Sequence, residues 1–429
     1  MSDEKPVPPG RLGRLARLAR ASARAGVDLL GSGDGAGAAE QASRALGQLR
    51  GLAAKVGQMA GYVDGLVPES RRDQYERHMT TLQAHAFTSS SRVIRDRVAT
   101  EMGGPVEAHF AAWDDEPIAS ASIGQVHRAR LADGREVAVK VQHPGIEVAL
   151  ESDLRNAKMF EGTLARIAGM RKFNSDGVLD EIRDRFREEL DYGLEASRMR
   201  RFGDLFAGDP RVRIPRVIDS HCTPRVLTAE LVTGLDFAAA RTKPEAQRRA
   251  WCETLWKFVY RSNLVGGLFN ADPHPGNYVF QPDGAIAFLD FGCVQPIAEE
   301  HRLCALGMHR AAHDRDSPAF LDAVRRLLQL QGGRYEPRAL DYVQGCFRPL
   351  WESPFRITRP YVAGLVNDLK GVVVEFRKSR DDGFVPLPPG TFFLNRMQFG
   401  FYSVLARLDA EVDYTAVERT FLAEVRGWV

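Results

Sequence analysis

Two short segments of the chain carry the oxygen-bearing side chains that a hard divalent cation prefers. The first reads ADPHPGN over residues 271–277, and the second reads DFG over residues 290–292. Asn277 and Asp290 offer an amide oxygen and a carboxylate, which suit Mg²⁺ or Mn²⁺. Asp272 stands where a base would orient an attacking hydroxyl or water. Because the dense negative charge of ATP phosphates requires such a cation, the pattern predicts ATP and Mg²⁺ (or Mn²⁺) as cofactors.

A lysine upstream of both segments fits the same chemistry. Lys140 closes the β-branched run VAVK, and in kinase-like folds the lysine at the end of the third strand contacts the α- and β-phosphates. Its ammonium needs a buried carboxylate partner, for which Glu195 on a predicted helix is the candidate. Asp272 and Asn277 have the spacing of the kinase catalytic loop. The order of these motifs along the chain predicts an α+β, bilobal protein-kinase-like fold with Asp272 and Lys140 as catalytic residues.

The segment before VAVK reads ASASIGQV, where a typical kinase has GxGxxG. Glycines let backbone N–H groups approach a phosphate closely, whereas alanine methyl groups restrict that approach and stiffen the loop. A plain strand-edge loop is the alternative, but the position one hairpin upstream of VAVK favours a nucleotide role. The predicted ATP-binding residues are Ala119, Ser120, Ala121, Ser122, Lys140 and Glu195, with Glu230 and Val232 in the strand-like run RVLTAELV.

The sequence around these motifs predicts the elements that hold them in place. ASIGQVHRARL and REVAVKVQ are β-rich and flank a turn signal at residues 132–134. We expect a basic amphipathic and disordered N-terminus with a linker over residues 1–40 and a helical extension over 41–112. A kinase-like N-lobe over 113–232 and a C-lobe with C-terminal helices over 233–429 follow.

The sequence predicts residue bounds for four helices and hairpins. The pattern is helical from Val93 to Ala112, and YVF and AIAFLDF flank a hairpin turn at residues 281–284. After the DFG segment we expect the chain to pass almost directly into a helix, from about Pro296. A last aromatic helix is expected from Thr391 to Leu408.

Composition narrows the classes of function. The 429 residues are 44% hydrophobic and 27% charged, with a formal net charge of +2, so a nucleic-acid partner is not expected. None of the five cysteines forms a CxxC pair, which argues against a disulfide framework or a zinc site. No apolar run of about 18 residues indicates a spanning helix, and the start lacks the apolar core of a secretory signal. We expect a cytoplasmic location.

Contact with a membrane surface is a hypothesis that rests on the first residues. In RLGRLARLARASARAGVDLL, starting at residue 11, two sets of residues occupy opposite sides of a helical wheel. One side carries Arg14, Arg17, Arg20 and Arg24, and the other carries Leu12, Leu15 and Leu18. Such a helix could lie on an anionic membrane. It could equally pack its leucines on the protein, or be a disordered basic tail.

These motifs together resemble the UbiB/AarF family of atypical protein-kinase-like proteins, which includes mitochondrial coenzyme Q biosynthesis ATPases. The family's KxGQ motif appears as KVGQ at residues 55–58, its alanine-rich loop as ASASIGQVH, and its ExD motif as ELD at residues 189–191. Its HADPHPGN loop appears as NADPHPGN, so Asn270 replaces a histidine. Because asparagine can still hydrogen-bond, we expect altered loop rigidity and retained metal binding.

The resemblance implies a restricted chemistry. In this family the KxGQ helix folds over the active site, so Lys55, Gln58, Glu189 and Asp191 are implied to gate substrate access. ATPase activity linked to lipid-soluble precursors and ubiquinone production is also implied. The partners implied are an anionic membrane, a prenyl-phenol or quinone-like lipid, and quinone-biosynthesis proteins. By helical spacing alone, Glu189 and Asp191 would not share a face unless the helix ends there.

Three functions remain open at this point. The first is an unorthodox ATPase that supports prenyl-lipid metabolism at a membrane surface. The second is a protein or small-molecule kinase, against which the missing APE motif speaks. The third is a non-enzymatic, nucleotide-gated module that binds a lipid or a biosynthetic complex. For His274, which lacks a second histidine at ligand spacing, we expect a structural role within its loop.

Overall fold

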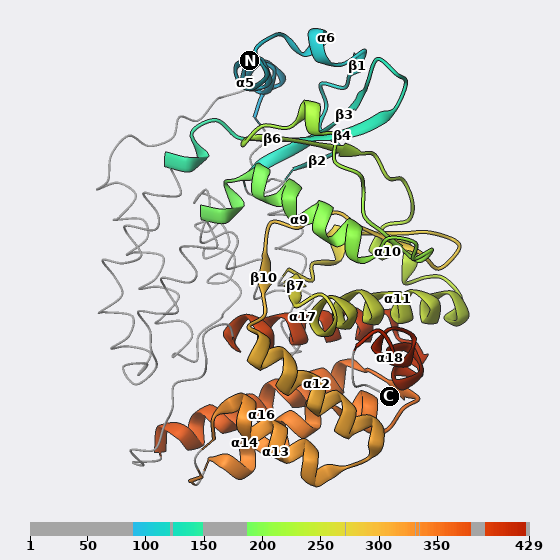
Figure 1. The fold of residues 1–429 in the computed structure, drawn as a ribbon. Coiled ribbons are helices and arrows are strands. Elements are labelled where there is room, and N and C mark those ends of the chain that lie inside the picture. The colour runs from blue at the N-terminus through green and yellow to red at the C-terminus, as the bar shows by residue number, and fades with distance from the viewer. Residues whose placement is uncertain are drawn as a thin grey trace, which may run out of the picture.

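The computed structural model describes residues 89–120, 123–148, 187–270, 272–330, 332–333, 335–378 and 391–425. Three sets of predicted features lie outside these residues: the predicted basic N-terminal helix, Lys55 and Gln58 of the KVGQ motif, and Ala121 and Ser122 of the alanine-rich loop. The predicted α+β class is confirmed, with a small sheet-bearing region above a larger helical region (Figure 1).

An antiparallel sheet forms the upper region. Its strands run in the order β1-β3-β4-β6, and β2 also pairs with β3. The predicted hairpin is present, since β3 and β4 are joined by a turn in which Gly134 has a φ of 90°. The strands are β1 Ala112–Trp113, β2 Ala119–Ser120, β3 Gly124–Arg130, β4 Glu136–Gln142 and β6 Val226–Glu230.

The two faces of β4 have different roles. Successive side chains of a strand point to opposite faces, and Val137, Val139 and Val141 are fully buried against helix α5, Ser91–Met102. Lys140 therefore projects from the opposite face, toward helix α9, Tyr192–Leu205. In Figure 1, α5 lies above this sheet and α9 lies below it.

The predicted helical pattern from Val93 to Ala112 is wrong in its extent. The structure has two helices there, α5 and the short α6, Val106–His109, before strand β1. Helix α5 ends at Gly103, whose φ of 78° is left-handed. Pro105 then precedes α6, and it cannot donate the backbone hydrogen bond that a continuous helix needs.

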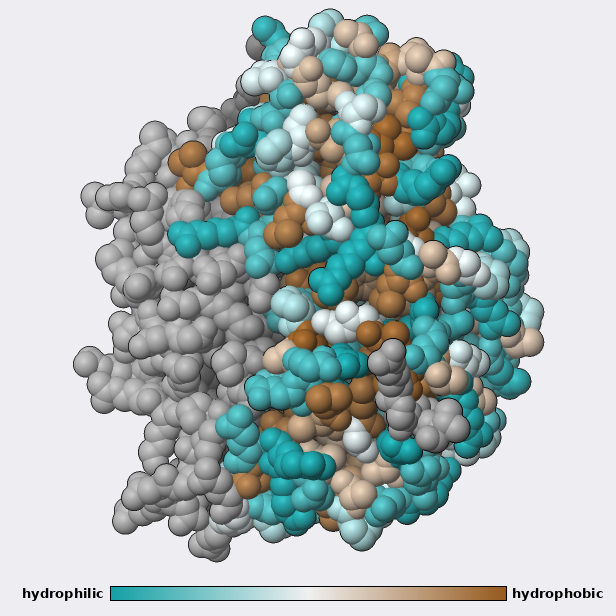
Figure 2. All heavy atoms as spheres, viewed as in Figure 1, coloured by the Kyte–Doolittle hydropathy of each residue, from teal (hydrophilic) through white to brown (hydrophobic). Residues whose placement is uncertain are grey.

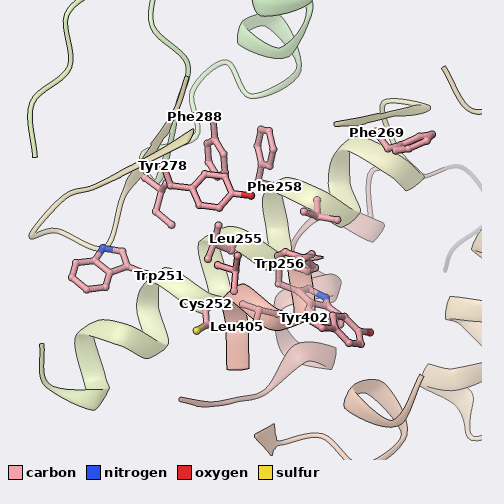
Figure 3. Close-up of a cluster of buried hydrophobic side chains, with 14 of the residues drawn as sticks. Trp251, Cys252, Leu255, Trp256, Phe258, Phe269, Tyr278, Phe288, Tyr402 and Leu405 are labelled. Carbon is pink, nitrogen blue, oxygen red and sulfur yellow. The ribbon is translucent and has the colours of Figure 1, made fainter. Parts of the chain in front are cut away.

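The lower region is built around helix α11, Glu245–Leu264. Figure 3 shows Trp251, Leu255, Trp256 and Phe258 of α11 among aromatic residues from other segments. The Phe258 ring stacks on Phe288 with a centroid distance of 3.6 Å. This aromatic layer anchors the small strands that carry the polar motifs.

Those small strands form two sheets. In the first, the predicted hairpin at residues 281–284 joins β8, Tyr278–Phe280, to β9, Ile286–Phe288, and β5, Val212–Arg213, pairs with β9. In the second, β7, Leu268–Asn270, pairs with β10, Val294–Pro296. The expected helix from about Pro296 therefore begins later, at Glu299, because the chain first pairs with β7.

Helices complete the lower region. The predicted last aromatic helix, Thr391–Leu408, is confirmed with those bounds as α17. The remaining α-helices and strands are α10 Phe237–Ala240, α12 Glu299–Asp314, α13 Ser317–Leu328, α14 Glu336–Cys346, α15 Arg348–Trp351, α16 Arg359–Lys378 and α18 Tyr414–Leu422, with strands β11 Phe355–Arg356 and β12 Glu411–Val412.

A buried carboxylate joins α18 to α11 and α12. Glu418 is fully buried and accepts a hydrogen bond from Trp256 Nε1 at 3.0 Å. Its Oε2 lies 2.9 Å from His309 Nδ1 and 2.9 Å from His313 Nε2. Burial alone would raise the pKa of the Glu418 carboxyl, but the two histidine rings lower it to about 2.

Candidate functional site

Lys140 meets two carboxylates where the sheet faces the lower region. Its Nζ lies 2.8 Å from both carboxylate oxygens of Glu195 and 3.8 Å from Asp290 Oδ2. It also lies 5.0 Å from the centroid of the Tyr192 ring. The Lys140 side chain is 18% exposed and that of Glu195 is 3% exposed. The structure therefore brings together three residues that the sequence placed in one site.

Electrostatics keep the lysine charged. Burial alone would lower the pKa of the Lys140 ammonium, but Asp290 and Glu195 together raise it well above its usual range. Burial also raises the pKa of the Glu195 carboxyl, against the lowering effect of Lys140. We place the charge on the ammonium at neutral pH, because both Glu195 oxygens face it at hydrogen-bond distance.

The local sequence explains how Glu195 reaches Lys140. Asp191 is the N-cap of α9, and its side chain accepts a hydrogen bond from the backbone N–H of Leu194 at 3.1 Å. Such a cap defines where a helix begins. Glu195 consequently falls in the first turn of α9, on the face toward the sheet.

The same cap separates the two acidic residues of the ELD motif. The preceding helical residues 187–189 end at a turn at Leu190, which is the exception that the spacing argument left open. Asp191 is exposed and caps α9, while Glu189 is buried. A Cβ added at Gly292 would lie 3.8 Å from Glu189 Cγ. Of the two, only Glu189 therefore lies beside the Asp-Phe-Gly turn.

Asn270 connects the two segments that are expected to bind the metal ion. Its Nδ2 donates a hydrogen bond to the carbonyl oxygen of Asp290 at 2.7 Å, and its Oδ1 accepts one from the backbone N–H of Asp272 at 3.1 Å. Asn277 Nδ2 donates to the carbonyl oxygen of Asp272 at 3.4 Å. Both ends of the Asn270 amide are thus used to hold the loop against the turn.

The structural role expected for His274 is confirmed. Its Nδ1 accepts a hydrogen bond from the backbone N–H of Gly276 at 3.0 Å, within the loop. Its own backbone N–H donates to the carbonyl oxygen of Asp272 at 2.8 Å. The imidazole therefore shapes the short turn that leads to Asn277.

The Asp-Phe-Gly turn presents one carboxylate oxygen to Lys140. Asp290 Oδ1 accepts the backbone N–H of Gly292 at 2.9 Å, while Oδ2 faces Lys140. The Phe291 ring is fully buried and packs against Phe202 of α9 with a centroid distance of 4.9 Å. Packing of Phe291 thus orients the preceding carboxylate.

These donors suit a magnesium ion held together with phosphates. Within the described residues, no three or more His, Cys, Asp or Glu side chains gather into a group that could hold a metal ion. Mg²⁺ typically takes only one or two carboxylates and completes its shell with water and substrate phosphates. The carboxylate of Asp290 and the amide of Asn277 fit that requirement.

The other predicted nucleotide contacts are placed only in part. Ala119 and Ser120 form β2 and pair with Val126 and Gln125 of β3. The Glu230 carboxylate is engaged by Arg216 at the surface, with Nη2 2.6 Å from Oε1. The backbone N–H of Glu230 is also engaged, since it donates to the carbonyl oxygen of Arg216 at 3.0 Å. Val232 follows the end of β6 in an irregular segment.

Sequence reasoning did not single out Gly124, Arg198 or Tyr192, although Gly124 lies in the segment ASASIGQV. A Cβ added at Gly124 would lie 2.5 Å from the carbonyl oxygen of Val141 and 2.6 Å from the Tyr192 hydroxyl, so a side chain is excluded where β3 approaches α9. Arg198 lies three residues beyond Glu195 on α9 and donates to the carbonyl oxygen of Gly292 at 2.8 Å. Helical spacing from Glu195 was the one signal that could have indicated Arg198.

The visible surface offers no single apolar face. Figure 2 shows hydrophilic and hydrophobic residues interspersed. Among the residues that the structure describes, the exposed large hydrophobic ones are Val93, Ile118, Val148, Leu289 and Leu303. Of the helices in the described ranges, none is both long enough and apolar enough to cross a bilayer.

Comparison with known proteins places this site in a family. A model of the ABC1 atypical kinase-like domain matches residues 81–323. The chain is 35% identical over 270 residues to the chloroplastic protein ACTIVITY OF BC1 COMPLEX KINASE 1 of Arabidopsis thaliana, covering 59% of this chain and 38% of that protein. It is 27% identical over 380 residues to the mitochondrial atypical kinase COQ8B of Rattus norvegicus, covering 87% and 70%. The chain thus spans well under half of the Arabidopsis relative.

A solved structure supports the fold over nearly the whole length. The complex of Rv3197 with erythromycin from Mycobacterium tuberculosis superposes with a TM-score of 0.63 at 26% sequence identity. The match covers 96% of this chain and 98% of that chain. The similarity therefore extends beyond the residues matched by the domain model.

Proposed function

Because the chain belongs to the ABC1 atypical kinase-like (UbiB/AarF) family, we propose that it binds ATP with a divalent metal ion and acts as an ATPase. The observation that carries this proposal is the position of Lys140 between Glu195, at 2.8 Å, and Asp290, at 3.8 Å. A lysine held charged by one buried carboxylate, beside a second carboxylate on a Gly-stabilised turn, suits a triphosphate bound with a metal ion.

Each residue would have a distinct task. Lys140 would contact the α- and β-phosphates, and Glu195 would hold its ammonium in place. Asp290 and Asn277 would bind Mg²⁺ or Mn²⁺, which neutralises charge on the phosphates. Asp272 would orient the attacking water or hydroxyl.

We propose that backbone groups at the end of strand β6 and after it bind the adenine base. The Glu230 carboxylate is engaged by Arg216, and the N–H groups of Glu230 and Leu231 donate to the carbonyl oxygens of Arg216 and Glu136. The Glu230 carbonyl oxygen and the Val232 N–H would therefore contact the base. The alanine-rich loop, with Ala119 and Ser120 in β2 and Ala121 and Ser122 after it, would cover the phosphates. Its methyl groups would hold the loop more stiffly than glycines do.

Hydrolysis or transfer to a small molecule is favoured over phosphorylation of a peptide. After Gly292 the chain forms β10 and enters α12 at Glu299, which leaves no long segment there for a peptide to dock against. The resemblance of the KVGQ motif, with Lys55 and Gln58, favours a covered site. A non-enzymatic nucleotide-gated module is the remaining alternative, which turnover measurements decide.

We further propose that the activity supports ubiquinone or other prenyl-lipid metabolism at a membrane surface. This part rests on the family resemblance and on the similarity to COQ8B. The lipid partner, contact with an anionic membrane and contact with quinone-biosynthesis proteins belong to the same proposal.

The test uses Asp290→Asn, which keeps the shape of the side chain and removes its charge. Saturating Mg-ATP should stabilise the parent by roughly 2–4 kcal/mol, and this stabilisation should be lost in the variant. Asp283→Asn is the matched control, because Asp283 lies in the exposed turn of the β8–β9 hairpin and pairs with Arg213 at 2.6 Å. Full stabilisation of Asp290→Asn by Mg-ATP would show that Asp290 does not bind the metal.

Turnover is measured separately. Phosphate release from ATP should be detectable in the parent and should rise when anionic liposomes or phenolic quinone-precursor analogues are added. Binding of Mg-ATP with no phosphate release under any of these conditions would favour the nucleotide-gated module. Transfer of phosphate to an added phenol or peptide would instead establish a kinase.

A further inference from the structure

Arg198 of α9 joins two segments that flank the proposed metal site. Its Nη1 donates a hydrogen bond to the carbonyl oxygen of Gly292 at 2.8 Å, and its Nη2 forms an ion pair with Glu188 Oε2. The Arg198 side chain is 12% exposed and that of Glu188 is 29% exposed. This largely buried guanidinium therefore connects the end of helical residues 187–189 to the Asp-Phe-Gly turn.

Three residues on one face of α9 contact that turn. A Cβ added at Gly292 would lie 3.9 Å from Glu195 Oε2, Arg198 binds the carbonyl oxygen of Gly292, and Phe202 packs against the Phe291 ring. Positions three and four apart on a helix lie on the same side. The face of α9 that holds Lys140 through Glu195 thus also holds the turn.

Gly292 is bonded through both of its backbone groups. Its N–H donates to Asp290 Oδ1 at 2.9 Å, and its carbonyl oxygen accepts from Arg198 at 2.8 Å. Glycine has the widest range of backbone conformations, so these two bonds restrict a residue that would otherwise move readily. When the carbonyl is held, the N–H stays directed at Asp290 and the Asp290 carboxylate keeps its orientation.

We infer that Arg198 is a positioning residue for metal-bound ATP, which acts through Gly292 on Asp290 and is itself set by Glu188. The inference rests on the proposed function. Glu188 directly precedes Glu189, so a shift of the ELD segment would move Glu188, release Arg198 and loosen the metal-binding turn. Movement of the acidic segment that lies beside the site is thereby coupled to the affinity of the site for its metal ion.

The chemistry requires arginine at this position. A guanidinium presents several donors in a planar fork and can bind a carbonyl and a carboxylate together, whereas a lysine ammonium is a compact point charge. Arg198→Lys keeps the charge and should lose one of the two contacts. Arg198→Met removes both contacts and keeps the apolar stem.

The experiment measures how the stabilisation of the full chain by ATP depends on metal concentration. Mg²⁺ and Mn²⁺ are titrated at constant ATP, and the metal concentration that produces half of the thermal shift is recorded. For Arg198→Met we expect an increase of about tenfold, which corresponds to roughly 1.4 kcal/mol, the order of a hydrogen bond to a charged donor. Arg198→Lys and Glu188→Gln should show smaller increases in the same direction.

Two controls separate positioning from general stability. Arg200→Met removes an exposed arginine of the same helix, which pairs with Asp219 at the surface, and should leave the half-maximal metal concentration within about twofold of the parent. In the Arg198 variants, ATP binding measured in EDTA should change less than ATP binding measured with metal. The reason is that the contact between Arg198 and Gly292 acts on Asp290 and not on the nucleotide base.

The outcomes are distinct. If the parent is not stabilised by Mg-ATP, the proposed function fails and this inference fails with it. If the parent responds and Arg198→Met shows the same metal dependence, or only a lower melting temperature, the positioning role is overturned and the proposed function stands. If Arg198→Met does not fold, an unchanged metal dependence in both Arg198→Lys and Glu188→Gln would overturn it equally.

Discussion

Lys140 and Glu195 should be energetically coupled far more strongly than an ion pair of similar length on the same hairpin. Lys140→Met and Glu195→Gln, alone and together, form the double-mutant cycle. The comparison pair is Arg128 of β3 and Glu136 of β4, whose side chains are 51% and 39% exposed and lie 2.7 Å apart. The two pairs differ mainly in burial, since Glu195 is 3% exposed.

The magnitude follows from that burial. At an effective dielectric constant of about 20, unit charges about 4 Å apart attract by roughly 4 kcal/mol, and desolvation opposes this gain. Removing one partner of a buried pair costs about 3–5 kcal/mol, and groups in contact couple by about 0.5–3 kcal/mol. We expect the upper part of that range for Lys140 and Glu195. For the exposed pair, about 0.2–1 kcal/mol is expected.

The two single variants should differ in how much they lower the free energy of unfolding. Glu195→Gln leaves Lys140 with Asp290 Oδ2 at 3.8 Å, so part of its stabilisation is retained. Lys140→Met leaves two neighbouring carboxylates without that ammonium, and it should therefore cost more. Urea unfolding at pH 7 gives the free energies, provided that the dependence on urea concentration is the same in all four proteins.

The dependence on pH gives the coupling an independent check. The pKa of Lys140 is raised in the folded state, so its stabilisation is present below the ordinary lysine pKa and is lost only as pH rises through the raised value. The coupling should accordingly be the same at pH 7 and pH 9. Additive effects within about 0.5 kcal/mol, or a coupling no larger than that of the exposed pair, would refute the reasoning.

Four further predictions concern other parts of the chain. Glu418→Gln should lower the free energy of unfolding by up to about 3 kcal/mol at pH 7. Glu424, which pairs with Arg261 at the surface, is the control, and Glu424→Gln should cost at most about 1 kcal/mol. Because the folded-state pKa of Glu418 is lowered, the cost should shrink as pH falls below about 4.5, as urea unfolding would show. Asn270→His should make the thermal shift with Mg-ATP depend on pH near 6.5, whereas the parent should show no such step. Gly400→Ala would place a Cβ 2.7 Å from Pro273 Cγ and should cost about 1–3 kcal/mol by urea unfolding, whereas an unchanged stability would mean that α17 does not press on the loop. Deleting residues 1–25 should sharply reduce co-sedimentation with cardiolipin-containing liposomes, at about 1 kcal/mol per basic residue, and leave ATP binding intact; equal sedimentation would contradict the membrane role of that segment.

Features that depend on short stretches could be predicted from the sequence. The turn at residues 132–134 and the hairpin turn at 281–284 follow from residues that favour tight turns between β-rich runs. The last aromatic helix, residues 391–408, follows from its uninterrupted helical pattern. The family follows from motifs whose order along the chain is specific.

Features that depend on the ends of elements were predicted less well. One helical pattern from residue 93 to 112 became two helices, because Gly103 is left-handed and ends the first, and Pro105 has no backbone N–H with which to continue it. The helix after the Asp-Phe-Gly turn begins at Glu299, because the preceding residues pair with β7. In both cases periodicity indicates a helix but does not locate its ends.

The sequence by itself determined which polar groups are available and in what order, because residue types and spacing are local properties of the chain. It also identified Lys140 and Glu195 as partners. Only the tertiary structure decided which neighbours each group meets. The structure places Asp191 at the N-cap of α9, so that it does not share a helical face with Glu189. It also brings Arg198 to the carbonyl oxygen of Gly292, which is 94 residues away in the sequence. Such contacts form when helices and strands pack against each other. The partner of a residue is therefore determined by the distant segments that pack around it, and not by its own segment.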